Sequence, residues 1–184
     1  MTDRILILVA PSSSGKNYVL EEYLKAHPNT ERIVTYTTRP MRTEANEKNH
    51  IDYHFVTDDE FDVLRLTGKL IEERSYHVAD GSVWRYGTSD FVNEWCHEYT
   101  MVLDLSGAEV VIKKYPNAEV LVKYIYAPDD IRTERAKKRG NFNEAEWERR
   151  LKTDAEDFSD EKLAHLNDIL RQYGNPPIEE VRNY

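Results

Sequence analysis

Short apolar runs alternate with helical segments along much of the chain. Residues 5–9 (ILILV), 101–105 (MVLDL) and 120–126 (VLVKYIY) have the continuous apolar character of strands buried on both faces of a parallel sheet. The first run is expected to be the central strand. Residues 17–27 (NYVLEEYLKAH) and 107–115 (GAEVVIKKY) are predicted helices between them. This alternation predicts a parallel sheet with right-handed crossovers.

The stretch from Thr37 to about Ser89 breaks this alternation. It combines short strand-like segments with one helix that starts near Asp58, so we expect a small insertion in the core fold. The sequence ADGS at residues 79–82 is typical of a hairpin turn. The short strands are expected at 33–36, just before the insertion, and within it at 53–56, 70–75 and 83–86.

The last third of the chain predicts further helices. They are expected from Asp129 to Lys138 and from Glu144 to Phe158, with RGNFN between them. Residues 168–171 are a possible edge strand, and Pro177 is expected in the first turn of a last helix. The whole pattern predicts a three-layer α/β fold with a small inserted domain.

Composition and charge narrow the class of protein. A net charge of -9 argues against a general surface for nucleic acid or anionic membrane, because such surfaces need an excess of Lys and Arg. Cys96 is the only cysteine, so an internal disulfide and Cys-based zinc sites are excluded. The sequence has no apolar run of membrane-spanning length and no signal-peptide pattern. We therefore expect a cytoplasmic protein.

The segment between the first predicted strand and helix resembles a P-loop, G-x-x-x-x-G-K-[ST], with two departures. Ala10 stands at the first glycine and Asn17 at the final hydroxyl. Backbone amides and the helix dipole converge on an anion at such a place, and Lys16 can reach the β- and γ-phosphates of ATP. The alternative is a plain strand-to-helix loop. The expected ATP-binding residues are Pro11, Ser12, Ser13, Ser14, Gly15, Lys16 and Asn17.

The two departures from the P-loop pattern differ in their expected effect on the site. Ala10 adds only a Cβ atom, unless that position requires a positive φ. At the position of Asn17 a Ser or Thr hydroxyl normally binds Mg²⁺, and an amide oxygen is a hard ligand in a different place. We expect Mg²⁺ as the cofactor of ATP, with Asn17 as its candidate protein ligand.

Residues 35–42 (TYTTRPMR) and 52–55 (DYHF) resemble the nucleotide-monophosphate site of guanylate kinases, S-x-T-T-R-x-P-R…D-Y-x-F. The proline is shifted by one position, but the arginines and the tyrosine keep their spacing. The resemblance implies that Arg39, Arg42 and Tyr53 bind the phosphate of GMP, with Thr35 at a guanine-contacting position. Two guanidinium groups can hold a dianionic phosphate bidentately. The alternative is a solvated basic loop.

Residues 70–89 resemble the F-I-E…Y-G-T-S run of the same family, which implies that Glu72, Tyr86 and Thr88 contact guanine and phosphate. A carboxylate can accept hydrogen bonds from N1–H and the 2-amino group of guanine, a donor pair that adenine lacks. The segment after Glu72 is longer than in the family pattern, so the alternative is that Glu72 is a surface residue of a strand. Asp104 matches the first acid of the family motif L-D-x-D-x-Q-G, but this chain lacks the second Asp and the Gln of that motif. The resemblance implies that Asp104 contacts the acceptor. The alternative is that Asp104 is the N-cap of a helix.

Residues 124–151 resemble a third block of the family, A-P-P…R-L-x-x-R-G…R-L. The resemblance implies that Arg135, Arg139 and Arg150 are lid arginines, and Gly140 allows the following segment to move. An exposed, salt-bridged helix is the alternative.

Together these resemblances imply a single guanylate-kinase-like domain with a P-loop NTPase fold. The expected reaction is transfer of the γ-phosphoryl group of ATP to GMP or dGMP, with Lys16 and Arg39 among the catalytic residues. The expected partners are ATP and GMP, without nucleic acid or membrane, in a monomer or homodimer.

Two alternatives stay open: a binding module of the same fold that has lost catalysis, and a kinase for another acceptor such as a ribose bisphosphate. The other candidates for catalytic residues are Arg135, Arg139 and Arg150. The domain is expected to divide into a core (about 1–36, 90–138 and 144–184), an acceptor-binding insertion (about 37–89) and a lid (about 139–150).

Overall fold

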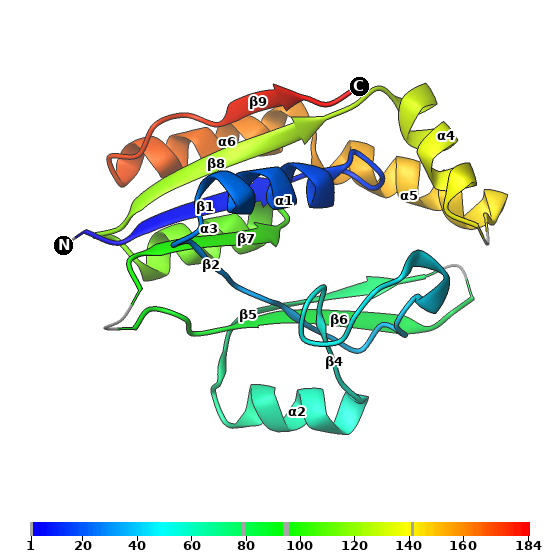
Figure 1. The fold of residues 1–184 in the computed structure, drawn as a ribbon, viewed down its shortest axis with the longest axis horizontal. Helices are drawn as coiled ribbons and strands as arrows, with labels where there is room; N and C mark the ends of the chain where they lie inside the picture. Colours follow the sequence, from blue (N-terminus) through cyan, green and yellow to red (C-terminus); the bar gives the residue numbers. More distant parts are fainter. Residues whose placement is uncertain (1, 79, 94–95, 141) are drawn as a thin grey trace.

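The computed structural model describes residues 2–78, 80–93, 96–140 and 142–184. The hairpin turn predicted at 79–82 and the lid predicted at 139–150 each include one residue outside this description. Two sheets lie one beside the other, with helices packed around the larger of them (Figure 1). The helical segments are α1 (Lys16–Ala26), η1 (Thr43–Ala45, a 3-10 turn), α2 (Asp58–Leu66), α3 (Leu105–Lys114), α4 (Asp129–Lys138), α5 (Glu144–Asp157) and α6 (Asp160–Gln172).

The larger sheet has five strands in the order β2-β7-β1-β8-β9, and all its pairs are parallel. Its central strand is β1, as the apolar pattern predicts. In register, Ile7 lies between Met101 on β7 and Val122 on β8. The strands are β1 (Arg4–Val9), β2 (Glu31–Arg32), β7 (Glu98–Leu103), β8 (Glu119–Tyr126) and β9 (Glu179–Arg182).

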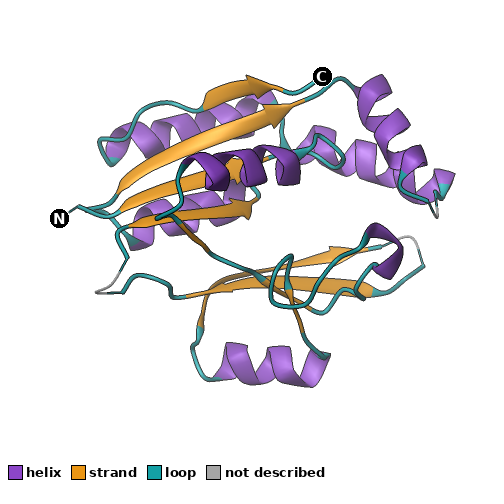
Figure 2. Cartoon of the chain, in the orientation of Figure 1, coloured by secondary structure: helices purple, strands orange, loops and turns teal. Residues whose placement is uncertain are grey.

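Helices cover both faces of this sheet, which confirms the predicted three layers (Figure 2). Successive side chains of a strand point to opposite faces. Ile5, Ile7 and Val9 accordingly enter the cluster formed with α3 and α6, whereas Leu6 and Leu8 enter the one formed with α1. The P-loop segment leaves the sheet from the end of β1, so this double-sided packing fixes its position.

The smaller sheet is formed within the predicted insertion, in the order β4-β3-β6-β5. Its one helix, α2, lies on the side away from the larger sheet (Figure 1). Thr57 and Glu60 form a capping box at the start of α2, and Phe61 is the fully buried residue of this helix. No helix among the described residues is long and apolar enough to cross a membrane. The strands are β3 (Tyr36–Thr37), β4 (His54–Phe55), β5 (Leu70–His77) and β6 (Val83–Ser89).

Three local predictions are wrong. Residues 33–36 do not form one strand, because the chain leaves the larger sheet after Arg32 and joins the smaller one at Tyr36. Residues 168–171 belong to α6, whose apolar face buries Leu166 and Leu170 against the core. Pro177 precedes the edge strand β9 and starts no helix.

Replacing Ile7 with alanine tests whether β1 is the centre of the core. Ile7 is fully buried, so the change is expected to lower the free energy of unfolding by about 2–5 kcal/mol in urea denaturation. Leu66→Ala is the control, because Leu66 is 77% exposed, and it is expected to change stability by no more than about 0.5 kcal/mol. Equal losses in both variants would contradict the layer assignment.

Candidate active site

The loop between β1 and α1 has the backbone shape of a phosphate cradle. Gly15 stands at the N-cap of α1 with φ of 88°, and Ser13 has φ of 62°. Ala10 is not among the described residues with a positive φ, so its Cβ causes no backbone strain. The hydroxyl of Ser14 is buried and has no hydrogen-bond partner among the described residues. This loop therefore offers amide and hydroxyl donors at the start of a helix.

Two helices from the second half of the chain fasten this loop at Ser12. Its backbone N–H donates to Asp154 Oδ2 on α5 at 2.9 Å, and its carbonyl accepts from Arg132 Nε on α4 at 2.8 Å. Arg132 and Asp154 also form an ion pair with each other. Burial raises the pKa of Asp154, against the opposing effects of Arg132 and the Ser12 hydrogen bonds. The sequence analysis did not single out this pair.

The side chain of Arg135, on α4, contacts the loop directly. Its Nη1 donates to the carbonyl of Ser14 at 3.0 Å, and its Nη2 donates to the carbonyl of Asn183 at 2.8 Å. The side-chain amide of Asn183, which follows β9, also donates to Ser14 at 2.8 Å. Arg135 therefore holds the P-loop to the last strand in this structure. Its predicted contact with the transferring phosphate stays a prediction.

Three cations, Lys16, Arg42 and Arg139, lie close to one another next to this loop. Burial lowers the pKa of Lys16 to about 8, and Arg139 is the next largest cause. Burial also lowers the pKa of Arg42 and of Arg139, and in both cases the charge of Arg150 adds to the effect. Arg150 itself donates to Glu146 at 2.7 Å. An anion bound here would relieve the mutual repulsion of these cations.

The side chains predicted for the acceptor phosphate lie beside this group. Arg39 is buried and makes a two-pronged ion pair with Glu47, at 3.0 Å and 2.8 Å. Its guanidinium lies 5.3 Å from the ring centre of Tyr53. Burial raises the pKa of Tyr53 to about 12, so its hydroxyl remains a proton donor at neutral pH. Glu47 is a partner that the sequence analysis missed.

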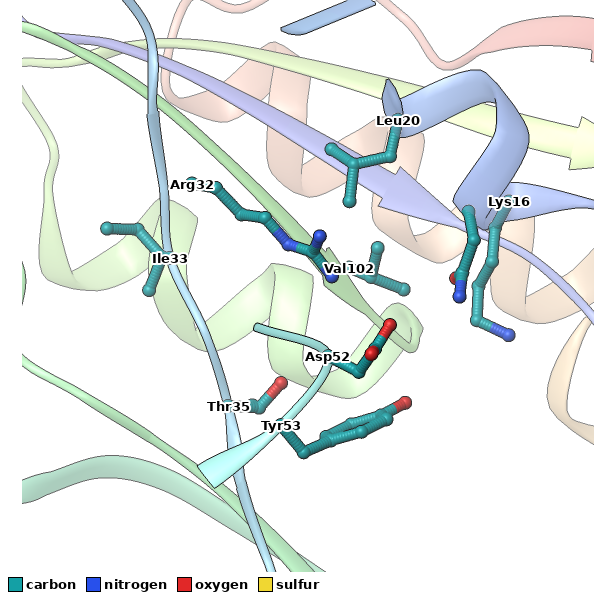
Figure 3. A pocket seen from close by; sticks show the side chains of 9 residues that line it. Lys16, Leu20, Arg32, Ile33, Thr35, Asp52, Tyr53 and Val102 are labelled. Carbon is teal, nitrogen blue, oxygen red and sulfur yellow. The ribbon is translucent and has the colours of Figure 1, made fainter. Parts of the chain in front are cut away.

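One pocket joins the P-loop to the predicted acceptor residues. Figure 3 shows Lys16 and Leu20 from α1 on one side of it, and Thr35, Asp52 and Tyr53 on the other. Asn17 and Arg32 also line this pocket. The structure therefore brings together the predicted donor lysine and two of the predicted acceptor residues.

The remaining predicted acceptor residues lie on the smaller sheet and at the end of β7. Glu72 is buried and accepts a hydrogen bond from Thr88 at 2.5 Å. Tyr86 packs edge-on against Tyr53, with ring centres 5.8 Å apart. Asp104 is the N-cap of α3 and accepts from the amide of Gly107 at 3.0 Å. Its predicted contact with the acceptor stays a prediction beside this structural role.

The donor atoms fit a magnesium ion that is held mainly by nucleotide phosphates. Asn17 is exposed at the first turn of α1, where its amide oxygen is available as a ligand. The described residues contain no cluster of three or more His, Cys, Asp or Glu side chains able to hold a metal ion. Mg²⁺ in phosphoryl-transfer sites usually has few protein ligands besides phosphate and water, so one amide ligand is compatible with it.

The lowered pKa of Lys16 predicts how ATP affinity depends on pH. Lys16 is mostly protonated in the free protein up to about pH 7 and loses its proton as the pH rises through 8, so phosphate binding must then take up a proton. The dissociation constant of ATP should therefore be about twice its value for protonated Lys16 at pH 8 and rise by up to about tenfold per pH unit above that. Calorimetric titration in buffers of different protonation enthalpy measures both effects. An equally steep rise in Lys16→Met would assign the dependence to another group.

Comparison with known proteins agrees with this geometry. Residues 2–171 match the sequence model of the guanylate kinase family. The guanylate kinase of Tropheryma whipplei (strain Twist) is 31% identical over 157 residues, which cover 83% of this chain and 78% of that protein. The guanylate kinase of Thermotoga maritima is 32% identical over 148 residues, covering 79% and 69%. A crystal structure of guanylate kinase from Anaplasma phagocytophilum shares the fold, with a TM-score of 0.56 at 22% identity over 94% of this chain and 87% of that one. The chain therefore belongs to the guanylate kinase family of phosphotransferases.

Proposed function

We propose that this chain transfers the γ-phosphoryl group of ATP to GMP or dGMP, giving ADP and the nucleoside diphosphate. The observation that carries the proposal is the group of neighbouring cations between the P-loop and the acceptor pocket. Lys16, Arg42 and Arg139 all have a pKa lowered there by partial desolvation and by other cations. Phosphoryl transfer requires in-line positioning and neutralisation of phosphoryl oxygens, which such a group supplies.

On the donor side, the P-loop is proposed to bind the phosphates of ATP. The unpartnered hydroxyl of Ser14 and the amides before α1 would donate to phosphate oxygens. Lys16 would reach the β- and γ-phosphates, and the bound phosphate would raise its pKa again. Arg132 and Asp154 keep the loop in place by holding Ser12 on both its N–H and its carbonyl.

On the acceptor side, Arg39, Arg42 and Tyr53 are proposed to bind the phosphate of the monophosphate. Arg39 keeps its ion pair with Glu47 and still has donors in its fork for a phosphate. Tyr86, which packs on Tyr53, would add a hydroxyl donor. Thr35, Glu72 and Thr88 are proposed to bind the base, with Asp104 beside them.

Closure of the lid is proposed to complete the site. The charges of Arg139 and Arg150 both lower the pKa of Lys16, so both are proposed to act on the transferring group. Closing also excludes water, which would otherwise hydrolyse ATP. When Mg²⁺ is bound, it neutralises charge on the phosphates, and Asn17 is its proposed protein ligand.

The two alternatives are less well supported. A binding module without catalysis has no use for a lysine and lid arginines that converge on the P-loop. A kinase for a ribose bisphosphate has no use for a buried carboxylate such as Glu72, which suits the donor edge of guanine.

Replacing Lys16 with alanine tests the proposed donor site. GMP-dependent formation of ADP should fall by roughly 100-fold or more, because a preorganised charge on the transferring group is lost. A coupled assay with ATP, Mg²⁺ and a panel of nucleoside monophosphates measures this and the acceptor preference together. Lys25→Ala on the same helix is the control, since Lys25 is exposed and pairs only with Glu22 among the described residues. Full activity in Lys16→Ala would remove the P-loop from the reaction.

A further inference from the structure

Strand β5 carries three polar side chains on one face, of which the proposed function uses one. Glu72, Arg74 and Tyr76 alternate with outward residues and so point to the same side. Arg74 Nη2 lies 3.1 Å from Glu72 Oε2, and Arg74 Nη1 forms an ion pair with Asp104 Oδ1. Tyr76 donates its hydroxyl to Asp104 Oδ2 at 2.6 Å. We call Glu72, Arg74 and Asp104 the acceptor triad.

The acceptor triad is largely withdrawn from solvent and shares one positive charge between two carboxylates. The Glu72 side chain is only 2% exposed, and those of Arg74 and Asp104 are each 18% exposed. A buried carboxylate is strongly unfavourable unless a counter-charge and hydrogen bonds hold it. Thr88 holds one oxygen of Glu72, and Arg74 faces the other. Arg74 is thus positioned to set the orientation of the Glu72 carboxylate.

The same guanidinium connects the smaller sheet to the core. Asp104 follows β7 and caps α3, which packs against β5. Gly107 in the first turn of α3 lies directly against Arg74, since a Cβ atom on Gly107 would lie 2.7 Å from Arg74 Nη2. A glycine at this position leaves the space that the guanidinium fills. Arg74 is therefore located by the core as well as by its own strand.

We propose that Arg74 is a specificity-determining positioning residue of the acceptor site. By fixing Glu72 between Thr88 and a guanidinium anchored on Asp104, it keeps both carboxylate oxygens aimed at the N1–H and 2-amino donors of a guanine base. The planar fork of arginine suits this task, because it holds two carboxylates in fixed directions where lysine offers a point charge. A carboxylate that rotates keeps one of the two hydrogen bonds and loses the other.

This inference rests on the proposed function, and a pair of acceptors tests it separately. GMP and IMP differ only by the 2-amino group, so the ratio of their kcat/KM values measures the second hydrogen bond to Glu72. The Glu72→Gln variant gives the reference value of that ratio for a site without the carboxylate. Arg74→Met should lower the ratio by roughly tenfold, through a higher KM for GMP, while kcat stays within about threefold.

Two further variants separate positioning from folding. Gly107→Ala adds one methyl group against the guanidinium and should lower the GMP to IMP ratio in the same direction, while alanine has the higher helix propensity. Arg85→Met is the matched control, because Arg85 lies on β6 of the same sheet but pairs with Asp58 and Asp62 of α2 and not with the triad. Its GMP to IMP ratio should stay within about twofold.

The outcomes are distinguishable. A ratio that Arg74→Met leaves unchanged, beside a collapsed ratio in Glu72→Gln, would overturn the inference and leave the proposed function intact. If Arg74→Met does not fold, Gly107→Ala decides by the same criterion. A wild-type protein that phosphorylates neither GMP nor IMP would overturn the proposed function itself, and the inference with it.

Discussion

The gathering of like charges at the end of the central strand is the constraint on which the rest of the structure depends. Lys16, Arg42 and Arg139 come from three parts of the sequence, and each has a pKa lowered by partial desolvation and by neighbouring cations. A folded protein keeps such a group only if the elements that carry it are firmly held. The double-sided packing of β1 and the fastening of the P-loop by α4 and α5 meet that need.

The arginines of the site divide into two kinds by their partners. Arg39, Arg132 and Arg135 are tied to Glu47, Asp154 and the carbonyl of Ser14, so they shape the loops that surround the phosphates. Arg42 and Arg139 instead have their pKa lowered by desolvation and neighbouring cations, which outweigh the opposing charge of Glu47, as expected of groups that bind an anion. The same division applies to the carboxylates, since Asp154 and Glu47 hold the loops whereas Glu72 and Asp104 share Arg74.

The sequence was sufficient for the features that local pattern determines. The central strand, the helix after the P-loop and the start of α2 near Asp58 follow, within a few residues, from hydrophobic periodicity and from turn and capping residues. Residues 168–171 were assigned wrongly because a short apolar pair, Ile169 and Leu170, suits a strand as well as the buried face of a helix.

The partners of the site residues could not be predicted in this way. Asp154 is 142 positions from Ser12, and Asn183 is 169 positions from Ser14. A charged or amide side chain on a helix or strand looks the same in sequence whether it faces water or a distant loop. Only the packing of α4, α5 and β9 around the P-loop identifies them.

If one set of cations serves two phosphate sites that meet end to end, adenosine and guanosine joined by five phosphates should span both sites in one molecule. Calorimetry can compare this compound with ATP and GMP alone. Its dissociation constant is expected to be at least about 100-fold below that of either nucleotide, because the second site is then filled intramolecularly. Affinity no greater than that of ATP alone would mean that the two phosphate sites do not meet.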